Sequence, residues 1–195
     1  MRIVRIGVLA VPAAVALTVA FAGAGRSQDT ADAERSAALF QAMMPVLSSP
    51  RCMNCHPAGD TPRQGEEGRL HQMLVTRGPD GFGSPALRCG ACHRAVNSPN
   101  SNIPGAEDWH LAPRGMAWEG LSAGALCRLL LDPTRNGGLT ADGLVAHMET
   151  SLVQWAWSPG IGLDGEPRRA PPSSGAHFVE LTRAWVASGA RCPTD

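Results

Sequence analysis

The chain has 195 residues, a length that suits a single domain. Its 17 basic side chains are all arginine and are balanced by 17 acidic ones, so nothing in the charge favours nucleic-acid binding. Glycine and proline are frequent, at 22 and 16 residues, whereas phenylalanine occurs 4 times and tyrosine is absent. This composition predicts a loop-rich chain with few large apolar side chains, whose core bound prosthetic groups would help to fill.

The first 24 residues have the pattern of a secretory signal peptide. Arg2 and Arg5 form a cationic start, residues 6–24 carry no charge, and the small residues that close this run fit an A-x-A cleavage site. We expect cleavage near Ala22 to Ala24, export to the periplasm, and a mature domain over residues 25–195 without stable membrane insertion. An uncleaved anchor helix is the alternative, because 19 uncharged residues nearly span a bilayer.

A helical pattern of apolar residues follows at residues 32–47, where Pro45 is expected to bend the helix. Residues 48–118 are rich in glycine and proline and are expected to be mostly loops.

Two C-x-x-C-H sequences, at residues 52–56 and 89–93, lie in this loop-rich stretch. Two cysteines at this spacing can form thioether bonds with the vinyl groups of one haem, and the following histidine can ligate the iron from the proximal side. The sequence therefore predicts two covalently bound haem c groups. Their residues are Cys52, Cys55, Cys89 and Cys92 for attachment and His56 and His93 as proximal iron ligands.

A zinc site made from two C-x-x-C pairs is the alternative. Zinc ribbons separate their pairs by about 15–20 residues, whereas 33 residues lie between Cys55 and Cys89. Zinc also gives no reason for a histidine directly after each pair, so the pattern favours haem.

Each haem iron has a sixth position, for which the remaining histidines are the first residues to consider. His71 follows the first motif's histidine by 15 positions and His110 follows the second's by 17, each after a Gly/Pro-containing loop. This approximate repeat favours His71 and His110 as distal ligands, without assigning either to a particular iron. His147 is the alternative distal ligand, and His177 is more typical of a surface residue.

The C-terminal part, residues 120–195, is mainly helical in pattern. Ser122 can cap a helix that runs to residue 131, and Thr140 can cap another that runs to about residue 155. A Pro/Gly-rich link then leads to a last helix. No segment has a convincing strand pattern, so the expected fold class is mainly α with extensive loops and little or no β-sheet, as a dihaem cytochrome c-like domain.

Two cysteines remain outside the motifs, Cys127 and Cys192. In an oxidising compartment an even remainder favours a disulfide. Cys127 falls in an expected helix and Cys192 lies just beyond the last one, so a bridge between them would hold the C-terminal end of the chain. Two free buried thiols are the alternative.

Five segments together resemble a known family. They are residues 51–60, 77–83, 109–113, 116–120 and 132–138. The family consists of small exported dihaem cytochrome-like proteins labelled isoquinoline 1-oxidoreductase subunit, and the resemblance extends over about residues 38–193. It implies a redox partner, a molybdenum hydroxylase that oxidises N-heterocycles and needs an electron acceptor. The family pattern has histidines at the positions of His71, His110 and His147, so it does not choose among them.

We therefore expect a periplasmic dihaem c-type cytochrome that transfers electrons from a dehydrogenase or molybdenum hydroxylase towards the respiratory chain. The chain has no ferredoxin-type cysteine set, so the resemblance implies that it is the electron carrier and not the catalytic subunit. A small dihaem peroxidase-like or reductase enzyme with one open iron is the first alternative. A haem-based sensor is the second.

Overall fold

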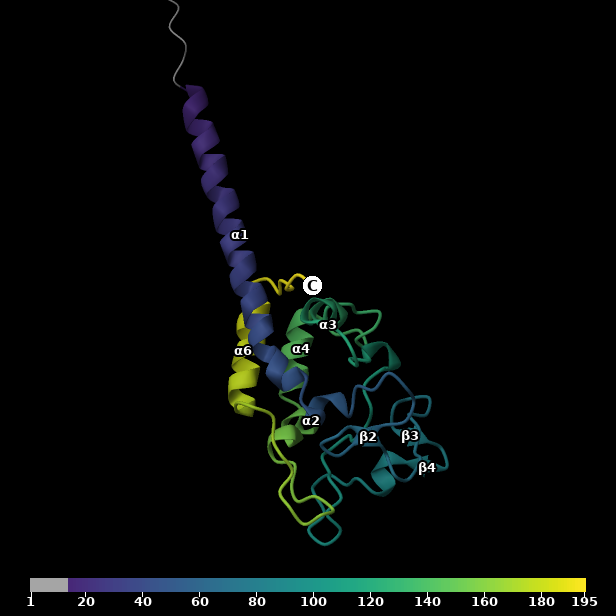
Figure 1. Ribbon diagram of the computed structural model, residues 1–195. Helices are drawn as coiled ribbons and strands as arrows, with labels where there is room; N and C mark the ends of the chain where they lie inside the picture. The colour runs from purple at the N-terminus through teal and green to yellow at the C-terminus, as the bar shows by residue number, and fades with distance from the viewer. Residues whose placement is uncertain (1–13) are drawn as a thin grey trace, which may run out of the picture.

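The computed structural model describes the backbone of residues 14–195 and the side chains from residue 28 onward (Figure 1). The cationic start of the expected signal peptide lies outside the described residues. The expected cleavage site falls within helix α1 (Ala14–Leu47), in its part without described side chains. Helix makes up 39% of the structure, and most of the rest is loops.

The long helix α1 and the last helix, α6 (Gly175–Ala187), lie side by side, as Figure 1 shows in purple-blue and yellow. Phe40 on α1 and Trp185 on α6 are fully buried against each other, with ring centroids 5.1 Å apart. Met43 and Phe178 continue the same contact. Burying side chains of this size stabilises a fold by about 1.5–3 kcal/mol each, so this helix pair forms the centre of an apolar core.

Two shorter helices, α3 (Ala123–Leu130) and α4 (Ala141–Met148), complete this core with Leu126, Leu130 and Leu144. Both begin as the sequence predicts. Ser122 Oγ accepts a hydrogen bond from Ala125 N at 3.1 Å, and Thr140 Oγ1 accepts one from Gly143 N at 3.1 Å. The helical part of the chain therefore has a core of its own side chains.

The helix expected from Thr140 to about residue 155 is wrong in its extent. It divides into α4, α5 (Ser151–Gln154) and the 3₁₀ turn η3 (Trp155–Trp157). Thr150 is the cause, because its hydroxyl donates to His147 O at 2.8 Å and accepts from Val153 N at 3.4 Å. Such local bonding competes with a continuous helix.

The disulfide predicted between Cys127 and Cys192 is confirmed, with Cα atoms 5.5 Å apart. It joins α3 to the segment that follows α6. Asp195 reinforces the junction by accepting hydrogen bonds from Ser122 Oγ and Arg128 Nη2.

The loop-rich part contains the short helix α2 (Pro50–Met53), two small hairpins and two 3₁₀ turns. In the hairpins β1 (Arg63–Gln64) pairs with β2 (Arg69–Leu70) and β3 (Gly83–Ser84) with β4 (Leu87–Arg88), both antiparallel. The 3₁₀ turns are η1 (Cys89–Ala91) and η2 (Arg114–Met116). Strands of two residues agree with the expectation of little β-sheet. Figure 1 shows this part to one side of the helices.

Candidate haem sites

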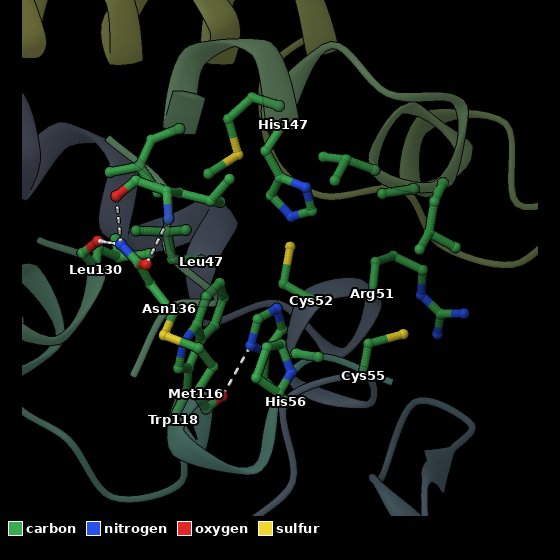
Figure 2. Close-up of a pocket in the computed structure, with 18 of the residues that line it drawn as sticks. Leu47, Arg51, Cys52, Cys55, His56, Met116, Trp118, Leu130, Asn136 and His147 are labelled. Carbon is green, nitrogen blue, oxygen red and sulfur yellow. Dashed lines mark hydrogen bonds between the residues drawn. The ribbon is translucent and has the colours of Figure 1, made fainter. Parts of the chain in front are cut away.

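The first C-x-x-C-H motif begins on α2 and ends in the turn that follows it. Cys55 N donates to Cys52 O at 3.1 Å and His56 N donates to Met53 O at 3.1 Å, so the motif winds as one tight turn. All three of Cys52, Cys55 and His56 line a cavity between this turn, α4 and α5 (Figure 2). Most other lining side chains are apolar, as a porphyrin face requires.

His56 is held in the tautomer that an iron ligand needs. Its Nδ1 lies 2.9 Å from Met116 O, and because a carbonyl can only accept, the ring proton must be on Nδ1. The lone pair of Nε2 therefore remains free for a metal. Behind it the indole of Trp118 stacks on the imidazole, with centroids 3.5 Å apart and an interplanar angle of 17°. Burial lowers the pKa of His56 to about 3, so the ring is neutral near pH 7.

The second motif repeats this arrangement in a different part of the chain. It follows β4 and forms the η1 turn, in which His93 N donates to Cys89 O at 2.9 Å. His93 Nδ1 donates to Pro104 O at 2.7 Å, and Trp109 stacks on the ring with centroids 4.5 Å apart and planes within 2° of parallel. Burial lowers the pKa of His93 as well. Both histidines therefore have a protonated Nδ1, a tryptophan behind the ring and a free Nε2.

The four motif cysteines have free thiols. Burial raises the pKa of Cys52 to about 11 and that of Cys55 to about 12. The Cys52 and Cys89 thiols add to the rise in the pKa of Cys55. Unpaired cysteines are what thioether attachment to the two vinyl groups of a haem requires.

Within the described part of the chain, no group of three or more His, Cys, Asp or Glu side chains is arranged so that it could hold a metal ion.

The histidines considered for the distal positions divide between the two motifs. His147, on α4, lies across the first cavity from His56, and its ring points into the cavity (Figure 2). His110 lines the same cavity, but its ring stacks on Phe82 at 4.6 Å and its Nδ1 donates to Asp108 O. His71 instead lies beside His93, with ring centroids 6.1 Å apart.

The sequence repeat left open which motif each of these histidines serves. His71, which follows the first motif, is beside the second motif, and His110, which follows the second, is at the first cavity. His177 is exposed at the start of α6, as its sequence context predicts. The spacing of histidines along the chain could not show this exchange, because it depends on how the loops fold back.

Arg51 is a site residue that the sequence did not single out. It directly precedes Cys52, is only 6% exposed and lines the first cavity. Its Nη2 lies 2.5 Å from Glu66 Oε1, whereas its Nε has no hydrogen-bond partner among the described residues. A buried guanidinium with an unused N–H suits a haem propionate, which accepts charge-assisted hydrogen bonds. In the sequence, the only indication of this role is that Arg51 directly precedes the first motif.

Arg88 directly precedes the second motif. Its Nη1 is paired with Asp80, 2.9 Å from Oδ2, on the surface. Burial lowers the pKa of Arg168, and the charge of Arg51 adds to this shift.

The second site differs from the first in being open. Exposed large apolar side chains lie within three residues of His71 or His93 in the sequence: Leu70 (54%), Met73 (64%), Leu74 (79%) and Val96 (70%).

Comparison with protein-family models, curated protein sequences and solved structures found no match to this chain. Within residues 14–195, no helix is long and apolar enough to cross a membrane.

Proposed function

We propose that this chain is an exported dihaem c-type cytochrome that transfers electrons in the periplasm. The observation that carries the proposal is the arrangement shared by His56 and His93. Each ring has its Nδ1 proton fixed by a backbone carbonyl, at 2.9 Å and 2.7 Å respectively, and a tryptophan stacked behind it. An iron-ligating imidazole requires such support, and both C-x-x-C-H motifs provide it in the same way.

When bound, each haem supplies a one-electron couple at its iron. The residues of this chain would hold each imidazole in place, and those of the first cavity would keep water away from the ring. Tryptophan stacking and the carbonyl bond prevent rotation of the ligand, so that little reorganisation accompanies a change of charge. At the first site we propose His147 as the distal ligand, because it lies across the cavity from His56 (Figure 2).

The connection between the two motifs is short, which favours transfer between two haems. Ala112 N donates to Cys55 O at 3.2 Å, and the adjacent Leu111 N donates to Gly81 O at 2.9 Å. Cys89 N in turn donates to Phe82 O at 2.8 Å. These few backbone hydrogen bonds fix the two attachment turns as neighbours.

The donor we propose is a molybdenum hydroxylase or another dehydrogenase, and this proposal rests on the family resemblance that the five segments carry together. The acceptor would be a component of the respiratory chain. A mature chain with 15 arginines, no lysine and 17 acidic residues would have a net charge of −2 after removal of Arg2 and Arg5. Four haem propionates would add to this negative charge, which would favour partners with basic docking surfaces.

A small peroxidase-like or reductase enzyme is the second candidate function, because it needs one iron with an open position. The exposure of the second site favours it. Met73 N donates to His71 Nδ1 at 3.3 Å, and this bond leaves the ring proton on Nε2, the atom that would have to ligate. An iron without His71 could accept peroxide or a nitrogen oxide.

Optical spectra of protein exported together with a haem-maturation system would test the proposal. An electron carrier should be low-spin at both irons when oxidised and should bind carbon monoxide slowly or not at all when reduced. A high-spin band and rapid carbon monoxide binding would favour the enzyme. A purified protein without a Soret band would exclude both.

A further inference from the structure

We infer that His71, from the loop that follows the first motif, is the distal ligand of the iron held by the second motif, so that the two sites are interlocked. The inference rests on the proposed haem binding. The main evidence is that His71 and His93, which are 22 residues apart in sequence, have ring centroids only 6.1 Å apart.

This separation is the one expected for two imidazoles on opposite sides of one metal. A histidine nitrogen lies about 2.0–2.1 Å from the metal it ligates. The ring centroid lies about 1.1 Å beyond that nitrogen, so two trans imidazoles place their centroids about 6–6.5 Å apart. The two rings are inclined at 64°, which axial ligation permits because each ring can turn about its own metal–nitrogen bond.

The chain holds His71 in this place through the first motif itself. Asn54 lies between the two cysteines. Its backbone oxygen accepts a hydrogen bond from Arg63 N at 3.1 Å, and its Nδ2 donates one to Gly65 O at 2.9 Å. These bonds fix the β1–β2 hairpin. His71 N then donates to Pro62 O at 3.0 Å directly after β2. The hairpin therefore carries His71 away from the first cavity and towards the second motif.

Exposed apolar residues lie near both histidines in the sequence. Leu70, Met73 and Leu74 are within three residues of His71, and Val96 is three residues beyond His93. A flat apolar ligand centred between the rings would cover such a surface. The occupant we assign is the second haem, because the free Nε2 of His93 and the Cys89 and Cys92 thiols are at the same place.

Ligation would require one local change. Nδ1 of His71 now accepts Met73 N at 3.3 Å, a long bond. When Nε2 of His71 binds the iron, Nδ1 must carry the proton, so this contact would be exchanged for a bond to a carbonyl or to water. One weak hydrogen bond is a small loss compared with a metal–ligand bond.

The test labels one haem and removes His71. In the Cys89→Ala protein the second haem keeps a vinyl group, which shifts its α band to longer wavelength and so separates it from the first haem. In this background His71→Gly should convert only the shifted haem to high-spin, and added imidazole should restore the low-spin form. The same change in a Cys52→Ala background, where the first haem carries the shifted band, should affect only the unshifted one.

Conversion of the first haem, or low-spin spectra at both haems, would overturn the inference while leaving a dihaem protein intact. A chain that carries no haem would overturn the proposed function as well, so the two failures differ. If the glycine variant does not accumulate, His71→Met keeps a sixth ligand. A redox titration followed at the shifted band should then show a raised midpoint potential. An unchanged midpoint potential at this band would count against the inference. His177→Ala, at an exposed position, is the matched control.

Discussion

Removing the Cys127–Cys192 disulfide should lower the free energy of unfolding by about 4 kcal/mol. The bridge spans a sequence separation of 65 residues. In the chain-entropy treatment, a closed loop of that length reduces the entropy of the unfolded chain by an amount worth about 4 kcal/mol at 25 °C. The variant for the test is Cys127→Ala/Cys192→Ala, because alanine leaves no unpaired hydroxyl at the buried position 127.

Guanidinium denaturation followed by circular dichroism, with haem-loaded protein throughout, measures this difference. Wild type under a reducing agent should approach the variant. Arg128→Ala is the matched control, because it removes only the ion pair between Arg128 and Asp195, whose side chains are 55% and 53% exposed. An exposed pair of this kind contributes about 0–1 kcal/mol.

A difference below about 1 kcal/mol between wild type and the double variant would refute this reasoning. Alkylation of the native protein would then give the cause. Two reactive thiols would mean that the bridge is absent in solution, whereas unreactive cysteines would mean that the loop-closure treatment overstates its effect.

Three further variants test the assignment of the sites. His147→Ala should convert one haem to high-spin and open it to carbon monoxide, whereas His110→Ala should leave both haems low-spin; the opposite result in optical and EPR spectra would reassign the first distal ligand. Arg51→Met should lower the midpoint potential of one haem, because it removes a positive charge beside the cavity. In a redox titration Arg51→Lys should have a potential between those of wild type and Arg51→Met. Equal potentials in all three proteins would exclude the propionate contact. Cys89→Ala should leave the second haem on one thioether bond, so that acid acetone extracts neither haem while the α band of one haem shifts to longer wavelength; two unshifted α bands would count against this attachment site.

Much of the helical part could be predicted from local signals. Ser122 and Thr140 are N-caps in the sequence and in the structure, because a cap depends on residues only three positions away. The disulfide followed from the number of cysteines left over. The break at Thr150 was missed because threonine at that position also suits a helix surface, and its two local hydrogen bonds decide the outcome.

The distribution of the histidines could not be predicted in the same way. His71 reaches His93 through the hairpin that Asn54 anchors, and two-residue strands leave almost no pattern in a sequence. His147 is on a helix whose approach to the first motif depends on the packing of α4 against α6. The burial of Arg51 likewise becomes visible only when α2, Glu66 and the cavity are seen together.

The central claim is that this chain carries two covalent haems, one on each C-x-x-C-H motif. Intact-protein mass spectrometry of the chain exported with a haem-maturation system, followed by peptide mapping, tests it most directly. The proposal predicts a mass increase of two haems, located on the peptides with Cys52–Cys55 and Cys89–Cys92, and loss of the residues before the cleavage site. A chain with one haem, with none, or with zinc in place of haem would contradict it.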